Sequence, residues 1–266
     1  MSNQIYTRAN VSPKAQIGEN VAVGPFTTVE DDVVIGDGTT IAGNALIGTG
    51  TRLGKDCRIH HGAVVGHMPQ DLKYRGEKST CELGDRTVIR EYATLHRGTG
   101  DGGRTIVGRD SFIMGYCHVA HDCRIGDHVI MSNAAMLAGH VAVEDHVIIG
   151  GITPVHQFVR IGRHAMIGGG LRVPKDVPPF VLAAGEPLAF GGLNSVGLRR
   201  RGFSRETLDS LQRLFLILYR SGLNVSQAVA AVKEDQELGK FPEVREVLDF
   251  ISQSKRGIIP APRLQN

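Results

Sequence analysis

A six-residue repeat of aliphatic side chains dominates this sequence. Stepping by six from Val11 to Val173 visits 28 positions, and 25 of them are aliphatic; the exceptions are Asp71, Glu77 and Asp101. A period of six is neither the period of an α-helix nor the simple alternation of a long strand. It fits short strands joined by tight turns, each strand pointing one aliphatic side chain inward. Three such strands make an 18-residue coil, so the repeat predicts a parallel β-helix of stacked coils.

A second column, four residues after each aliphatic position, holds mostly small side chains. All four cysteines fall in this column: Cys57, Cys81, Cys117 and Cys123. We therefore expect them to be small buried side chains rather than disulfides or metal ligands. A core built from aliphatic and small residues is narrow, which agrees with an aromatic content of 5% and the absence of tryptophan.

The repeat is interrupted twice, at residues 68–82 and 98–104, by polar segments rich in Gly, Lys, Arg and Asp. These segments are predicted to be loops that leave the column. Loops on a rigid scaffold are where functional residues concentrate.

The repeat stops after Pro178 and Pro179, and helical patterns follow. We expect a β-helical domain over residues 1–189 and a helical domain over 190–266. The predicted helix starts are Ser204, then Asn224 or Ser226, then Pro242, with the last helix stopping near Gly257.

Charge and hydropathy exclude several protein classes. The net charge is +3, from 30 basic and 27 acidic residues, so neither a nucleic acid nor another strongly charged partner is indicated. The longest apolar run, Leu214–Tyr219, is far too short to cross a membrane. The N-terminus has no apolar stretch of signal-peptide length, so a cytoplasmic protein is expected.

Polar side chains converge on one edge of three consecutive coils. At a spacing of one coil, His121 is in register with Gly139, and Asp122 is in register with His140. Neutral imidazole accepts a proton near pH 7, so such a cluster suits general-base catalysis. Turn histidines are also commonly just solvated, and the spacing alone leaves both interpretations open. The residues of this edge are His118, His121, Asp122, Gly139, His140, His156 and Gln157.

Two other features have competing interpretations. His128, His146 and His164 are spaced one coil apart and should stack in turns that face water. Imidazoles stacked at strand spacing do not form a tetrahedral site, so no metal is expected there. Three adjacent arginines, 199–201, lie between the repeat and the first expected helix. They could be a solvated charge run or a site for phosphates or an acidic protein.

Seven motifs resemble those of a known enzyme family. They are Gln70–Tyr74, Leu95–Thr99, Ala120–Cys123, Leu137–His140, Val155–Phe158, Asp176–Pro179 and Arg200–Glu206. Together, over nearly the whole chain, they resemble the acyl-ACP–UDP-N-acetylglucosamine O-acyltransferases, which are hexapeptide-repeat enzymes. The resemblance implies a left-handed β-helix followed by a C-terminal helical domain, and a homotrimer with sites in the clefts between subunits.

The resemblance also implies a reaction. A (3R)-hydroxyacyl chain would move from acyl carrier protein to the 3-hydroxyl of UDP-N-acetylglucosamine, the first step of lipid A biosynthesis, with no cofactor, metal or acyl-enzyme. His121 matches the general base, Asp122 an orienting acid, and Gly139 a backbone N–H for the oxyanion. Asp71 and Lys73 match sugar contacts; His96, His118, His140, His156 and Gln157 match further substrate contacts; Asn194, Arg200 and Arg201 match nucleotide and phosphate contacts.

Some details and alternatives stay open. Relatives carry a glutamate where this chain has Val196 and a histidine near Leu188, so nucleotide recognition is in doubt. Neither the acyl length nor the choice between a 3-hydroxyl and a 3-amino acceptor is fixed. The sibling N-acyltransferase of the pathway normally has an extra N-terminal domain, whereas repeats here begin by Val11. A zinc lyase of the γ-carbonic-anhydrase type and a non-catalytic β-helical scaffold are the remaining alternatives.

Overall fold

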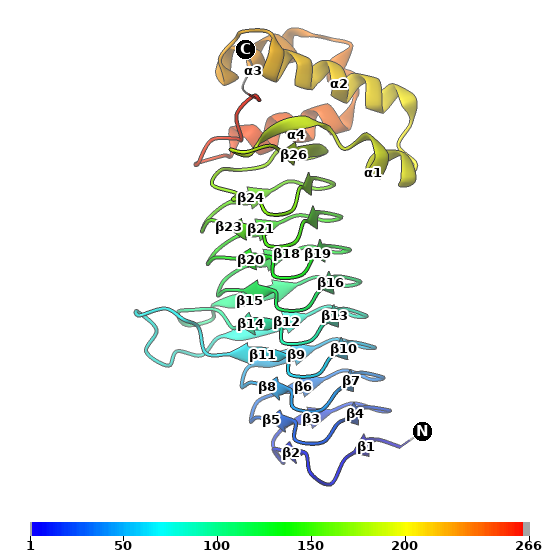
Figure 1. The fold of residues 1–266 in the computed structure, drawn as a ribbon, viewed down its shortest axis with the longest axis vertical. Coiled ribbons are helices and arrows are strands. Elements are labelled where there is room, and N and C mark those ends of the chain that lie inside the picture. Colours follow the sequence, from blue (N-terminus) through cyan, green and yellow to red (C-terminus); the bar gives the residue numbers. More distant parts are fainter. Residues whose placement is uncertain (1, 263–266) are drawn as a thin grey trace.

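Short strands stack into a tall three-sided column, and helices cover its C-terminal end (Figure 1). This computed structural model describes residues 2–262. Met1 and residues 263–266, the outermost parts of the two expected domains, lie outside the described residues.

Consecutive strands enter three different sheets in turn. The first sheet contains β1 (Gln4–Ile5), β4 (Ala22–Val23), β7 (Thr40–Ile41), β10 (Arg58–Ile59), β13 (Val88–Ile89), β16 (Phe112–Ile113), β19 (Ile130–Met131), β22 (Ile148–Ile149), β25 (Met166–Ile167), β26 (Val181–Ala184) and β27 (Ala189–Leu193). The second contains β2 (Asn10–Val11), β5 (Thr28–Val29), β8 (Leu46–Ile47), β11 (Val64–His67), β14 (Thr94–His96), β17 (His118–Val119), β20 (Met136–Leu137) and β23 (Pro154–Val155). The third contains β3 (Gln16–Ile17), β6 (Val34–Ile35), β9 (Thr51–Leu53), β12 (Thr80–Leu83), β15 (Arg104–Val107), β18 (Arg124–Ile125), β21 (Ala142–Val143) and β24 (Arg160–Ile161).

These sheets form the predicted left-handed parallel β-helix. The predicted register is confirmed, because His118 pairs with Met136, its counterpart on the next coil of the sequence repeat. Among the strand pairs of residues 2–262, only the antiparallel pair of β26 and β27 departs from parallel pairing, and it closes the first sheet beneath the helices.

The core is built as the repeat predicts. The second residue of most two-residue strands is buried; Ile35, Ile89 and Ile113 are at most 1% exposed. Val11 and Ile17 are only partly buried because few coils lie below them. All four cysteines are free and buried, and burial raises the pKa of Cys57 and Cys117 to about 11 and of Cys81 and Cys123 to about 12. The expectation of inert small core side chains is thus confirmed.

The two interruptions are loops, but both end earlier than predicted. The first covers residues 68–79, because Thr80–Leu83 is strand β12 and Cys81 pairs with Thr51. The second covers 97–103, because β15 begins at Arg104. Across the loops Val64 pairs with Thr94 and Thr94 with His118, so each insertion lengthens its coil by whole repeats and the coils resume in phase. The first loop projects from the column, in cyan in Figure 1.

In the part of the chain that the structure describes, four α-helices and one 3₁₀ turn follow the column: α1 (Ser195–Arg200), α2 (Arg205–Arg220), α3 (Val225–Glu234), η1 (Leu238–Lys240) and α4 (Pro242–Ser252). Ser204 caps α2, accepting from Thr207 N at 3.1 Å. Of the two candidates for the second start, Asn224 is the cap, with Gln227 completing a capping box. Helix α1 was not predicted, and α4 ends at Ser252 rather than near Gly257. No helix among residues 2–262 is long and apolar enough to cross a membrane.

Side chains of the last coils attach the helices to the column. Asp176 is 1% exposed and accepts from Arg160 N at 2.9 Å and from Ser254 Oγ at 2.7 Å. The Arg160 guanidinium lies 4.4 Å from the centre of the Phe250 ring, a cation–π contact. The helices thereby cover a coil end that would otherwise expose its aliphatic core.

The predicted histidine stack is present. His128, His146 and His164 are parallel, with successive ring centres 4.7 Å apart. The expectation that all three face water is wrong for His164, which is 5% exposed because Phe180 and Phe203 pack against it.

Burial of His164 predicts a pH dependence of stability. Burial, helped by His146 and the nearby arginines, lowers the pKa of His164 to about 3. An unfolded histidine titrates near pH 6.5, so between about pH 6.5 and 3 the unfolded state binds a proton that the folded state does not. The free energy of unfolding therefore falls as the pH drops through this range.

We expect His164→Asn to be less stable than wild type at about pH 8 but to lose less stability on acidification to about pH 5. Urea unfolding at both pH values measures this. His61→Asn, which changes an exposed histidine, is the control. Equal losses in wild type and His164→Asn would contradict the assignment.

Candidate active site

The predicted polar cluster lies along one corner of the column, where turns lead from the second sheet to the third. His121 and Asp122 follow β17, and Gly139 and His140 follow β20, one coil further along. The backbone N–H of His140 donates to the His121 carbonyl at 3.0 Å, which fixes the two turns against each other. The register predicted from the sequence therefore brings these residues together.

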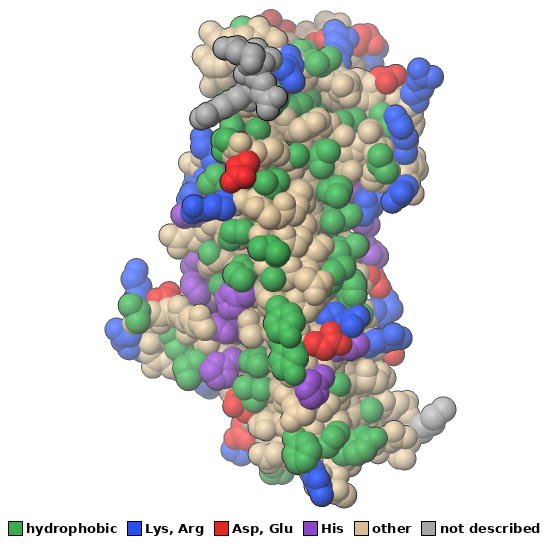
Figure 2. Space-filling model, in the orientation of Figure 1, with side chains coloured by type: hydrophobic (Ala, Val, Ile, Leu, Met, Phe, Trp, Pro, Cys, Tyr) green, Lys and Arg blue, Asp and Glu red, His purple; other side chains and the backbone are tan. Residues whose placement is uncertain are grey.

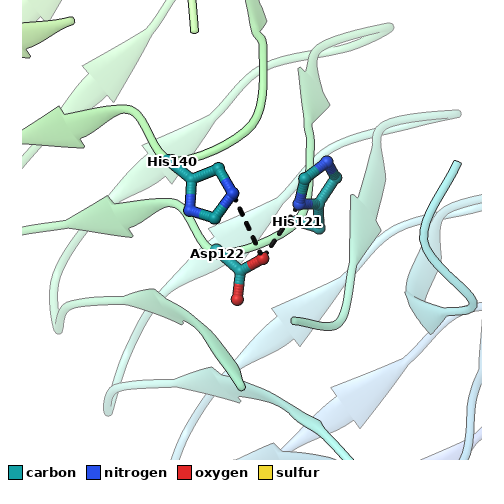
Figure 3. A group of neighbouring side chains, drawn as sticks. All are labelled: His121, Asp122 and His140. Carbon is teal, nitrogen blue, oxygen red and sulfur yellow. Dashed lines mark hydrogen bonds and ion pairs between the residues drawn. The ribbon is translucent and has the colours of Figure 1, made fainter. Parts of the chain in front are cut away.

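His121 and Asp122 form a hydrogen-bonded pair (Figure 3). His121 Nδ1 and Asp122 Oδ2 are 2.9 Å apart, and both side chains are 14% exposed. An ionised carboxylate accepts the Nδ1 proton and leaves Nε2 with its lone pair. The charged group facing Nε2 is Asp71, whose Oδ2 lies 3.9 Å away.

Asp122 is held in its ionised form by residues of the second loop. Its carboxylate accepts from the Thr99 hydroxyl at 2.6 Å and from the Thr99 N–H at 3.1 Å. Burial pushes the pKa of Asp122 up, but the hydrogen bonds from Thr99 and His121 outweigh it, and the pKa falls below its ordinary value of 3.8. The Asp122 N–H donates to Thr105 Oγ1 at 2.9 Å.

Gly139 lies directly against the His121 ring. A Cβ at position 139 would lie 2.6 Å from His121 Cε1 and 2.7 Å from Nε2, so only glycine fits without moving the ring. Within residues 2–262 the Gly139 N–H has no hydrogen-bond acceptor. Gly139 thus offers an unpaired backbone donor next to the His121 ring.

Neutral imidazoles form a wall beside the pair. His96 is 4% exposed, and burial, with the positive charges that His118 and His67 can carry, lowers its pKa to about 4. Burial and His121 also lower the pKa of His118, whose Nδ1 lies 2.7 Å from Thr94 Oγ1. Both rings are therefore uncharged at pH 7.

His140 borders the pair on its other side. Its ring is edge-on to His121, with centres 5.2 Å apart, and it stacks on Phe158 at 4.7 Å. His156 and Gln157, one coil beyond Gly139, are exposed, and His156 Nδ1 lies 3.0 Å from the Gln157 carbonyl oxygen.

The first loop brings Asp71 to the cluster, while Lys73 next to it is exposed to solvent. The Lys73 N–H donates to Asp71 Oδ1 at 2.8 Å. Arg97, from the second loop, donates to the Tyr74 hydroxyl at 3.0 Å and thus ties the two loops together. The sequence motifs contain both Arg97 and Tyr74, but neither was assigned a role.

Three predicted residues lie at a different corner, where turns lead from the third sheet to the first. Asn194 is 6% exposed; its side chain donates to the His164 carbonyl at 2.9 Å and accepts from Gly197 N at 3.3 Å as the cap of α1. Arg200 is exposed at the end of α1, and Arg201 is partly buried. The arginine run is therefore the end of a helix, not the linker that the sequence suggested.

The two departures from the family pattern have different surroundings. Val196 lies in α1 and is 57% exposed, so it could face a ligand, whereas Leu188 is 5% exposed and packs in the core.

Within residues 2–262, one group of donors has the spacing for a metal ion. Atoms of His121, Asp122 and His140 lie within 4.8 Å of one another (Figure 3). Histidine and carboxylate suit zinc and similar ions. However, Asp122 Oδ2 already accepts from His121 and from the Thr99 hydroxyl, so a cation would have to displace these hydrogen bonds.

Comparisons with known proteins agree on one family. A model described as UDP-N-acetylglucosamine O-acyltransferase, domain 2, matches residues 176–259, and one for bacterial transferase hexapeptide repeats matches 14–49, 32–67 and 104–139. An acyl-[acyl-carrier-protein]–UDP-N-acetylglucosamine O-acyltransferase of Thermodesulfovibrio yellowstonii is 47% identical over 96% of this chain and 99% of its own. The chain belongs to this family.

Solved structures agree with the sequence relatives. A UDP-N-acetylglucosamine acyltransferase from Bacteroides fragilis is 45% identical, with a TM-score of 0.93 over 96% of this chain and 99% of its own. Another from Campylobacter jejuni is 39% identical, with a TM-score of 0.90 over 98% and 100%. The sibling N-acyltransferase, the zinc lyase and the scaffold are not favoured by these matches.

The contact between Gly139 and His121 predicts a selective loss of activity. We expect Gly139→Ala to lower the acyltransferase kcat by about 100-fold, because the new methyl group displaces the His121 ring. Circular dichroism and the melting temperature should stay close to wild type. Gly115→Ala is the matched control: it changes the same turn position at another corner, where a Cβ would lie no closer than 3.2 Å to its neighbours. Equal activity of the two variants would contradict the contact.

Proposed function

We propose that this member of the family transfers a (3R)-hydroxyacyl chain from acyl carrier protein to the 3-hydroxyl of UDP-N-acetylglucosamine, the first step of lipid A biosynthesis. The observation that carries the proposal is the hydrogen-bonded pair of His121 and Asp122, with a free Nε2 beside the Gly139 N–H. Such a donor substrate places the reaction in the cytoplasm.

The geometry supports a direct transfer. Asp122 holds the proton on His121 Nδ1, and Nε2 removes the proton of the sugar 3-hydroxyl as its oxygen attacks the thioester carbonyl. The Gly139 N–H donates to the oxyanion of the tetrahedral intermediate, a contribution of about 3 kcal/mol in comparable enzymes. The intermediate then breaks its carbon–sulfur bond, and the departing thiolate takes the proton from Nε2. The products are the ester and the free carrier thiol.

The remaining predicted residues are proposed to bind the substrates. Asp71 and Lys73, both in the first loop, would contact the sugar. The substrates would find further polar contacts at this corner, on either side of His121, from His96, His118, His140, His156 and Gln157. Arg200 and Arg201 would contact phosphate. Asn194 would contact the nucleotide through its side-chain amide, the same group that caps α1.

A site divided between two corners supports a homotrimer. His121 lies where the second sheet meets the third, and Arg201 adjoins the histidine stack where the third sheet meets the first. One chain does not bring them together, whereas a second copy alongside could. Exposed apolar side chains on the column suit such contacts: Tyr116 is 63% exposed and Ile152 is 72% exposed. Figure 2 shows hydrophobic and histidine side chains along the visible face.

We also propose that residues 1–189 and 190–266 are the two domains. The six-residue repeat ends before this boundary and the capped helices follow it, although strand β27 (Ala189–Leu193) still pairs with the first sheet.

The direct test is transfer from a panel of (3R)-hydroxyacyl carrier proteins to UDP-N-acetylglucosamine, read by mass spectrometry with a chelator present. We expect an ester-linked product, whose mass also gives the acyl length. A matched 3-amino acceptor distinguishes ester from amide formation. We expect His121→Ala to abolish transfer while the fold is retained. Activity of this variant within a few-fold of wild type would remove His121 as the base, and loss of wild-type activity on chelation would indicate a metal.

The phosphate contact is tested separately. We expect Arg200→Ala to raise the KM for UDP-N-acetylglucosamine or for the acyl carrier protein, because a guanidinium that pairs with phosphate or acidic groups is lost. Arg220→Ala, at an exposed position of α2, is the control. Unchanged KM values for both substrates would return the arginines to a solvated charge run.

A further inference from the structure

We propose that Thr99 is a positioning residue for this reaction: from the second loop it holds the Asp122 carboxylate on His121 and away from His140. The inference rests on the proposed function, since it concerns the same His121 base.

Thr99 supplies two donors to one carboxylate. Its hydroxyl donates to Asp122 Oδ2 at 2.6 Å, and its N–H lies 3.2 Å from Oδ1 and 3.1 Å from Oδ2. Oδ2 is also the atom that accepts from His121 Nδ1 at 2.9 Å. The Thr99 hydroxyl therefore determines where the oxygen that orients the base is placed.

The carboxylate has a second imidazole within reach. His140 Nε2 lies 3.8 Å from Asp122 Oδ2, the same oxygen that contacts His121 (Figure 3). A small rotation of the Asp122 side chain would move the hydrogen bond from one histidine to the other. Pairing with His140 would leave the His121 ring without the partner that fixes its tautomer.

The backbone conformation of Asp122 does not by itself determine which histidine its carboxylate contacts. Asp122 has a positive φ of 59°, and its N–H is bound to Thr105 Oγ1, so its Cα is fixed. Its side chain still rotates about two bonds, and the shortest contact that restrains it on the His121 side is the Thr99 hydroxyl, 2.6 Å from Oδ2. The column alone does not supply this contact, because Thr99 lies in the loop that interrupts the coils, at residues 97–103.

Thr99→Val tests the inference, because valine keeps the shape and the N–H but removes the hydroxyl. We expect kcat to fall by about tenfold. This is the lower end of the activity losses seen when a residue that only orients a metal ligand by a hydrogen bond is removed. The KM values for both substrates should stay within about twofold, since Thr99 is not proposed to bind either. Thr99→Ser, which keeps the hydroxyl, should restore activity.

A double-mutant cycle separates positioning from a structural role. In an Asp122→Ala background, Thr99→Val should cause no further loss, because Thr99 acts only through the Asp122 side chain. A further tenfold loss would overturn the inference. Thr39→Val, which removes a buried hydroxyl bonded to the Gly54 carbonyl far from the site, should lower the melting temperature without changing kcat.

The outcomes also separate the two proposals. Inactive wild-type protein in the transfer assay would overturn the proposed function. Active wild type with a fully active Thr99→Val variant would overturn only the role of Thr99. Should Thr99→Val unfold, Thr99→Ala is measured in its place with the same expected loss and the same rescue by serine.

Discussion

The stacking of coils around an aliphatic core is the constraint on which the rest of the molecule depends. Each coil buries its inward side chains only when the coil above repeats the same register, as between His118 and Met136. The register therefore aligns every turn with the turns above and below it. Residues one coil apart therefore become neighbours through the register alone. Gly139 lies against His121 for this reason.

Because of this register, the sequence repeat predicts the site residues that lie in the repeated turns, but not those that lie in the loops and the helices. Register alone paired His121 with Gly139 and Asp122 with His140, because turn positions repeat as strictly as core positions. It could not place Thr99, since an inserted loop leaves the register, and a threonine in the small-residue column looks like core. The sequence placed the arginine run outside a helix for a related reason: the short helix α1 is held by its cap, Asn194, rather than by a repeat.

The two inserted loops add polar side chains to one corner of an otherwise repetitive fold. Both loops return the chain to the same phase, so they cost the core little while adding side chains at one height. One loop delivers Asp71 and the other delivers Thr99, and a hydrogen bond from Arg97 to Tyr74 couples them. In the proposed mechanism, the scaffold supplies His121 as the base and the Gly139 N–H as the oxyanion donor, and the loops supply the residues that orient the base and face the acceptor.

Burial then decides where charge can develop. Desolvation keeps His96 and His118 uncharged at pH 7, so these neighbours add no cation beside the base. His121 lies between two carboxylates, Asp122 at 2.9 Å from Nδ1 and Asp71 at 3.9 Å from Nε2. If His121 takes the proton as proposed, positive charge forms where negative groups are already placed, which would lower the barrier without reorganisation. A charged imidazole at position 96 or 118 would oppose this, and burial of both rings disfavours their charged forms.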